Sequence, residues 1–74
     1  MAPLRPLPYR EVQRRLEAAG FTEASQKGSY VKFVKRTDED VRTAIVPRHR
    51  EVAVGTLRSI LRQAGIGPDT FERL

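Results

Sequence analysis

The chain has no cysteine, no tryptophan and only one histidine, His49. Without cysteine there are no disulfides, no thiolate nucleophile and no cysteine metal site. One histidine among scattered carboxylates lacks the ligand spacing of a metal centre. The five glycines stand singly, so no glycine-rich phosphate loop is present. These absences exclude the common enzyme motifs, and we expect neither a metal nor a cofactor.

Long apolar runs are also missing. No stretch approaches the roughly 20 apolar residues that span a bilayer. The first eight residues, MAPLRPLP, lack the apolar segment of a secretory signal. We therefore expect a cytoplasmic protein with no membrane partner.

The composition describes one small, basic domain. The 74 residues are 39% hydrophobic, and 14 Lys and Arg outnumber nine Asp and Glu to give a net charge of +5. A domain of this size buries only about 60% of the surface of its unfolded chain, which allows one thin core. The positive charge favours a polyanionic partner, either nucleic acid or an acidic protein, without choosing between them.

The most informative stretch is KGSYVKFVK, residues 27–35. Gly28 provides the freedom for a tight turn, and the alternation that follows predicts a strand over residues 30–36. Val31 and Phe33 would then face the core. Tyr30, Lys32 and Val34 would share the outer face, in water.

Two amphipathic helices flank this strand. The first is predicted to begin at Pro8, to pair Glu11 with Arg15 at i,i+4 and to end at Gly20, with Phe21 folding back onto it. The second ends at Gly65 in the same way. A last short helical turn follows Pro68. Apolar residues recur at helical spacing in both helices: Tyr9, Val12, Leu16 and Ala19 in the first, and Val54, Leu57, Ile60, Leu61 and Ala64 in the second.

Two further strands are predicted, at residues 22–26 as a weak edge and at residues 41–46, where Pro47 stops the pairing. Either of two sets of side chains on the later strand could face the core: Val41, Thr43 and Ile45, or Ala44 and Val46. The fold class is therefore α+β in the order αβββα, with a three-stranded antiparallel sheet and both helices on one face. Residues 1–7 are an irregular lead-in, and residues 8–74 form a single domain. We expect a core that contains Val12, Leu16, Phe33, Leu57, Ile60 and Leu61.

Basic side chains gather near the central strand and in the following loop. Their positions are Lys27, Lys32, Lys35, Arg36, Arg48 and Arg50, with like-charged i,i+4 pairs at Arg10 and Arg14 and at Arg58 and Arg62. One interpretation is a surface that contacts phosphates. A solvated charged face is equally consistent with charge alone.

Several segments, in order, resemble the HicA toxins, also called the YcfA-like family. They are LEAAGF from residue 16, QKGS from 26 leading into Lys32-Phe33, VPRH from 46 and GTLRSILRQAGI from 55. The resemblance covers about residues 8–71. It implies a fold of the double-stranded-RNA-binding type, an mRNA endoribonuclease (mRNA interferase) activity and a HicB-like antitoxin partner.

The resemblance also implies a site, with one departure. The family pattern has a catalytic histidine after Gly-Ser, whereas this chain has Tyr30. Histidine exchanges a proton near neutral pH, but tyrosine, with an ordinary pKa of about 10, is a poor base there. Tyr30 could still donate a hydrogen bond to a phosphate or stack on a base. The RNA-binding surface is expected at Lys27, Gly28, Ser29, Lys32 and Arg48.

Whether the protein is an enzyme stays open. Tyr30 is consistent with a natural variant of altered activity, with a deliberate inactivation, or with a domain that only binds. His49 is an alternative proton-transfer group, although a loop histidine without a catalytic role is the simpler interpretation. Three functions compete: a toxin ribonuclease that is active or impaired, a non-catalytic RNA-binding module, and a protein-interaction domain. A homodimer is left open.

Overall fold

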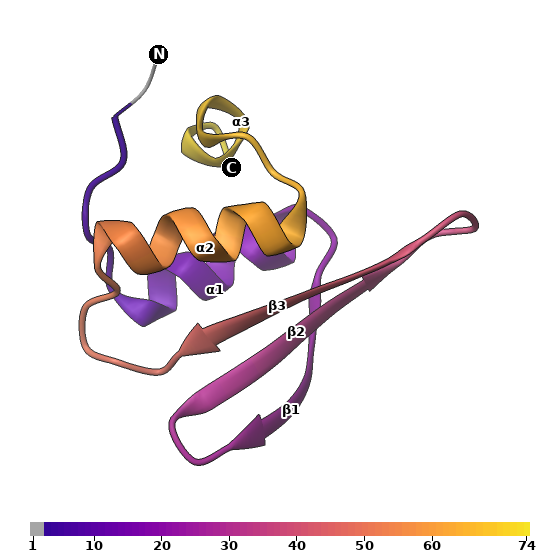
Figure 1. Ribbon diagram of the computed structural model, residues 1–74, viewed down its shortest axis with the longest axis horizontal. Helices are drawn as coiled ribbons and strands as arrows, with labels where there is room; N and C mark the ends of the chain where they lie inside the picture. The colour runs from indigo at the N-terminus through magenta and orange to yellow at the C-terminus, as the bar shows by residue number, and fades with distance from the viewer. Residues whose placement is uncertain (1–2) are drawn as a thin grey trace.

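The computed structural model describes residues 3–74. The elements are α1 (Tyr9–Ala18), β1 (Thr22–Lys27), β2 (Tyr30–Arg36), β3 (Val41–Pro47), α2 (Val54–Ala64) and α3 (Pro68–Glu72). The strands form one antiparallel sheet in the order β1-β2-β3, and α1 and α2 lie on the same face of it (Figure 1). The predicted α+β fold, αβββα with a short C-terminal helix, is confirmed. Residues 1 and 2 of the expected lead-in lie outside the described residues.

The core lies between the sheet and the two long helices. All six predicted core residues are buried, and Val31, Ala44, Val46 and Phe71 join them in one cluster. Both helices therefore bury one apolar stripe against the same side of the sheet, which leaves the other side uncovered by helices.

Both long helices end as the sequence predicts. Gly20, after the C-cap of α1, has φ 100°, and Gly65, the C-cap of α2, has φ 70°. The amide of Phe21 donates to the carbonyl oxygen of Leu16 at 2.9 Å, and the amide of Ile66 donates to that of Leu61 at 3.0 Å. These bonds satisfy carbonyls that a helix end otherwise leaves free. One boundary differs, because α1 begins at Tyr9 and Pro8 occupies the N-cap position.

The register of the sheet decides which face of β3 is buried. Ala44 lies opposite Phe33 and Val46 opposite Val31, so both point to the core. Ile45 is therefore on the outer face and is 39% exposed. The strand continues to Pro47, which still lies opposite Tyr30, so the expectation that Pro47 stops the pairing was wrong by one residue. Proline is tolerated on this edge strand.

The expectation that Val34 lies in water on the outer face was also wrong. Alternation places Val34 on that face, between Thr22 and Thr43 of the neighbouring strands, yet it is buried, with 7% exposure. Val34 does not belong to the main core cluster. Because β2 is the central strand, its neighbours on both sides help to bury even an outward side chain of the size of valine.

A contact that the sequence does not predict ties the lead-in to the domain. Leu7 is buried and pairs with Val52, with the amide of Leu7 donating to Val52 at 3.1 Å and the amide of Val52 donating back at 2.7 Å. This bridge holds the segment after β3 beside the start of α1.

The C-terminal helix is held by a buried arginine. Arg15 is 7% exposed, and its guanidinium contacts Glu11 at 2.8 Å, donates to the carbonyl oxygen of Phe71 at 3.2 Å and lies 3.7 Å from Glu72. The guanidinium also lies over the Phe71 ring, 5.0 Å from its centre. The predicted pair of Glu11 and Arg15 is confirmed, and it forms part of a clamp between α1 and α3.

One edge of the sheet is covered by a side chain from α2. The amide of Ile45 on β3 donates to Oε1 of Gln63 at 3.0 Å, and Nε2 of Gln63 donates to the hydroxyl of Ser59 at 3.3 Å. The edge of β3 therefore has a partner at this residue.

Candidate nucleic-acid interface

A shallow hollow lies on the outer face of the sheet, beside the turn between β1 and β2. We call it the turn hollow, and its lining residues are Ser25, Lys27, Gly28, Ser29, Tyr30, Lys32 and Ile45. The register explains this set, because Lys27 lies opposite Tyr30, and Lys32 lies opposite both Ser25 and Ile45. Residues opposite one another in antiparallel strands share a face.

Tyr30 is the most accessible aromatic side chain of this hollow, with 54% exposure. The turn before it favours glycine because Gly28 has φ 59°. Crowding is not the reason, since no described atom lies within 4 Å of a Cβ built there. Nε2 of Gln26 donates to the carbonyl oxygen of Gly28 at 3.2 Å. The turn therefore sets Tyr30 at the first position of β2, between two lysines.

Arg48 lies beside the turn hollow, although it does not line it. Its amide donates to the carbonyl oxygen of Ser29, and its Nη1 donates to Oε1 of Gln26 at 2.9 Å. The structure thus brings four of the five predicted binding residues together with Tyr30, at Lys27, Gly28, Ser29 and Lys32. The fifth, Arg48, is hydrogen-bonded to the same turn.

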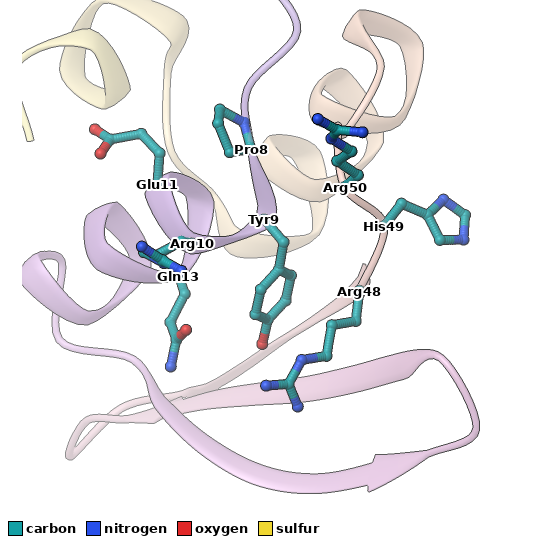
Figure 2. Close-up of a pocket in the computed structure, with 8 residues that line it drawn as sticks. All are labelled: Pro8, Tyr9, Arg10, Glu11, Gln13, Arg48, His49 and Arg50. Carbon is teal, nitrogen blue, oxygen red and sulfur yellow. The ribbon is translucent and has the colours of Figure 1, made fainter.

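His49 lines a different hollow from Tyr30. This second one, the arginine hollow, lies between the start of α1 and the segment after β3, and is lined by Pro8, Tyr9, Arg10, Glu11, Gln13, Arg48, His49 and Arg50. Figure 2 shows the imidazole of His49 pointing away from the Tyr9 ring. The two candidate proton-transfer residues, Tyr30 and His49, are therefore not gathered at one centre.

Tyr9 is a polar residue of this region that the sequence pattern treats only as a core position. It is 9% exposed, and its hydroxyl is a buried group with no hydrogen-bond partner. The guanidinium of Arg48 lies over its ring, 5.4 Å from the centre. Burial raises the pKa of the Tyr9 hydroxyl, nearby Glu23 and Glu17 add to the rise, and Arg48 opposes it. The sequence signal for this residue is a tyrosine at a helix position where the pattern expects an apolar side chain.

Two of the remaining basic residues are not available at the turn hollow. Lys35 turns to the helix-covered face, where its side chain lies against Gly20. Arg14 is paired with Glu11 at 2.6 Å. Charge counting therefore overestimates the cations available to a ligand.

Two further findings concern metals and membranes. Within residues 3–74, no group of three or more His, Asp or Glu side chains is arranged to hold a metal ion. Over the same residues, no helix has the length and apolar character to cross a bilayer.

A family model matches most of this chain. The model of the HicA toxin of bacterial toxin-antitoxin systems matches residues 9–66. The chain belongs to the HicA toxin family. The match runs from α1 through α2 and contains the lining of both hollows except Pro8. The protein is therefore a toxin of a toxin-antitoxin system with an antitoxin as its partner. A search of curated proteins finds no match.

Proposed function

We propose that this HicA toxin binds RNA at the turn hollow and is an endoribonuclease impaired by Tyr30. The observation that supports the proposal is the placement of a half-exposed Tyr30 beside Lys27 and Lys32 on the outer face. Lysines attract the phosphate backbone, and an aromatic ring offers a stacking surface for a base. The hollow thus has the chemistry of a binding site for single-stranded RNA.

The same hollow lacks an efficient proton-transfer group. Attack of a ribose 2′-hydroxyl on the adjacent phosphodiester needs a base to take its proton and an acid to protonate the leaving 5′-oxygen. The hydroxyl of Tyr30 can donate a hydrogen bond to a phosphate oxygen, but tyrosine is a weak base at neutral pH. General acid–base catalysis contributes about 10²–10⁴-fold, so cleavage should be slow by that factor while binding is retained.

The antitoxin is proposed to cover the turn hollow. Blocking the RNA-binding surface is the simplest way to silence the toxin, and acidic residues on the antitoxin would complement Lys27, Lys32 and Arg48. Lys32→Glu should then weaken both RNA and antitoxin binding. Unchanged antitoxin affinity together with lost RNA binding would contradict the shared surface.

The test of the catalytic proposal is Tyr30→His. RNA cleavage is measured against pH for the natural protein, for Tyr30→His and for Tyr30→Phe, with RNA affinity measured in parallel. We expect Tyr30→His to gain cleavage with a pH dependence centred near the histidine pKa, to keep its RNA affinity and to be toxic to cells without the antitoxin. Tyr30→Phe should not gain cleavage.

Two outcomes would redirect the proposal. Fast cleavage by the natural protein that is lost in His49→Ala would move catalysis to the arginine hollow. No cleavage by any form, with RNA binding intact, would favour the second candidate function, a non-catalytic RNA-binding module. The presence of Tyr30 in place of the family's histidine supports this candidate.

A further inference from the structure

The arginine hollow has an excess of cations without anionic partners. Within residues 3–74, no ion pair involves Arg10, Arg48 or Arg50. Glu11 also lines the hollow, but Arg14 and Arg15 hydrogen-bond its carboxylate and hold its pKa at about 2. Its charge is therefore already paired. Glu17 and Glu23 lie near the Tyr9 hydroxyl but do not line the hollow, so the lining itself carries an excess of positive charge from three arginines without an ion pair.

The start of α1 adds a positive end of a helix to this hollow. The ten-residue helix begins at Tyr9, and no side chain caps it at Pro8. The first amides of a helix have no partner within the helix and carry partial positive charge. The start of α1 lies across the hollow from the segment that carries Arg48 and Arg50 (Figure 2).

A buried hydroxyl forms an independent observation at the same place. Figure 2 shows the Tyr9 hydroxyl pointing toward the space between Gln13 and Arg48. It is buried and has no partner, although native structures satisfy most buried polar groups. A ligand oxygen that entered beside Arg48 would offer this hydroxyl an acceptor.

The two hollows lie at the same end of the molecule. The turn between β1 and β2, the segment after β3 and the start of α1 come together there (Figure 1). Arg48 joins them, because its Nη1 bonds Gln26 next to the turn while its guanidinium stacks on Tyr9. That bond uses one of five guanidinium N–H donors, so the others are available to a ligand.

We propose that the arginine hollow binds a second phosphodiester group of the same RNA strand that enters the turn hollow. Arg48 and Arg50 would hold the phosphate oxygens, and the positive end of α1 would lie beside the anion. Tyr9 would position Arg48 with its ring and donate its hydroxyl to a phosphate oxygen. Arginine suits this role because its planar group binds phosphate through two hydrogen bonds. A nucleic-acid strand carries charge at every nucleotide, which fits two separate cationic hollows at one end of the sheet. This inference rests on the proposed RNA binding.

The first test uses inorganic phosphate alone and follows side-chain NMR signals of His49 and the arginines. We expect saturable shifts in the natural protein and an affinity about 10-fold weaker or more in Arg50→Gln, since bonds to charged groups are the strong ones. Arg58→Gln is the matched control, because Arg58 is exposed on α2, lines neither hollow and loses the same charge. Shifts that do not saturate, or equal losses in the two variants, would overturn the site.

The second test separates this inference from the proposed function. Affinity is measured for an RNA dinucleotide and for a 12-nucleotide strand, in Arg50→Gln and in Lys32→Gln. We expect Lys32→Gln to weaken both ligands and Arg50→Gln to weaken only the longer one. If Arg50→Gln leaves the longer RNA unaffected, the second phosphate site is wrong while RNA binding stands. If Lys32→Gln affects neither RNA, the turn hollow is wrong. If Arg50→Gln weakens only antitoxin binding, the hollow serves the protein partner instead.

The hydroxyl of Tyr9 is tested by Tyr9→Phe. We expect weaker phosphate binding without any loss of thermal stability, because the substitution removes a buried group that has no partner. A purely structural role would alter stability and leave phosphate affinity unchanged, and that result would remove Tyr9 from the site.

Discussion

Lys35 on β2 and Arg42 on β3 lie opposite one another, and each packs against the glycine that ends a different helix. A Cβ built on Gly20 would lie 3.1 Å from Cε of Lys35, and one on Gly65 would lie 3.0 Å from Cζ of Arg42. Like charges opposite one another in a sheet are destabilising. Here Asp40 pairs with Arg42 at 3.2 Å, and the partial negative charge at the two helix C-termini also offsets that repulsion.

Gly65→Ala should lower the free energy of unfolding by about 1–2 kcal/mol, because a left-handed residue with a Cβ is strained. The new methyl group would also displace the guanidinium of Arg42. Urea denaturation measures the effect. Gly55→Ala is the control and should be stabilising by about 0.5–1 kcal/mol, since Gly55 lies in the first turn of α2 with open space around it. Equal effects of the two substitutions would contradict this assignment.

Glu11 should make stability depend on pH in the acid range. Hydrogen bonds from Arg14 and Arg15 lower its pKa from 4.5 to about 2. The unfolded chain then binds the proton first as pH falls, so the contribution of Glu11 is complete above about pH 5 and is lost between there and about pH 2. Glu11→Gln should flatten the urea midpoint against pH over this window. A parallel slope in the variant would assign the acid sensitivity to other carboxylates.

Arg15→Met should loosen α3. The substitution keeps an unbranched apolar stem but removes the bonds to Glu11 and to the carbonyl oxygen of Phe71. We expect a loss of about 2–3 kcal/mol and faster amide exchange in α3. Arg14→Met is the comparison variant. It breaks an exposed pair with the same Glu11 and an exposed hydrogen bond from Nη2 to the carbonyl oxygen of Leu74 at 3.0 Å, so it should cost less than about 1 kcal/mol. A larger loss of stability in Arg14→Met than in Arg15→Met would contradict the role of Arg15 as a clamp between α1 and α3.

Lys32→Gln should change how RNA binding depends on salt. Removing one phosphate contact reduces the slope of log K against log salt by about 0.7 for a single strand. The measurement is RNA affinity at several salt concentrations, with Arg58→Gln as the variant of equal charge. The same slope change in both variants would indicate only a loss of net charge.

Local patterns were enough to predict the helices and the central strand. The spacing of Val12 and Leu16 predicts the apolar side of the first helix. The glycines at positions 20 and 65 predict where the two long helices end. The inward face of β3 could not be chosen in this way, because both of its faces carry apolar residues. Pairing with Phe33 decides it, and such pairing is a property of the whole sheet.

The candidate site was predictable only where it is local. Lys27 to Lys32 are close in sequence and share one hollow. The pairing of Leu7 with Val52 brings Tyr9 and Arg48 together in the arginine hollow. Periodicity within a segment does not predict a contact between segments so distant in the chain. For the same reason, the sequence does not reveal that His49 and Tyr30 line different hollows.

Gln63 has a consequence for how this small sheet meets other chains. By occupying the amide of Ile45 it removes part of the template that an extra strand would need on β3. On the opposite edge, the register of β1 shifts between Glu23 and Ser25, and such an irregularity also disfavours a regular added strand. Each border of the sheet thus carries one feature that disfavours edge-to-edge pairing, while the open face presents an exposed Tyr30.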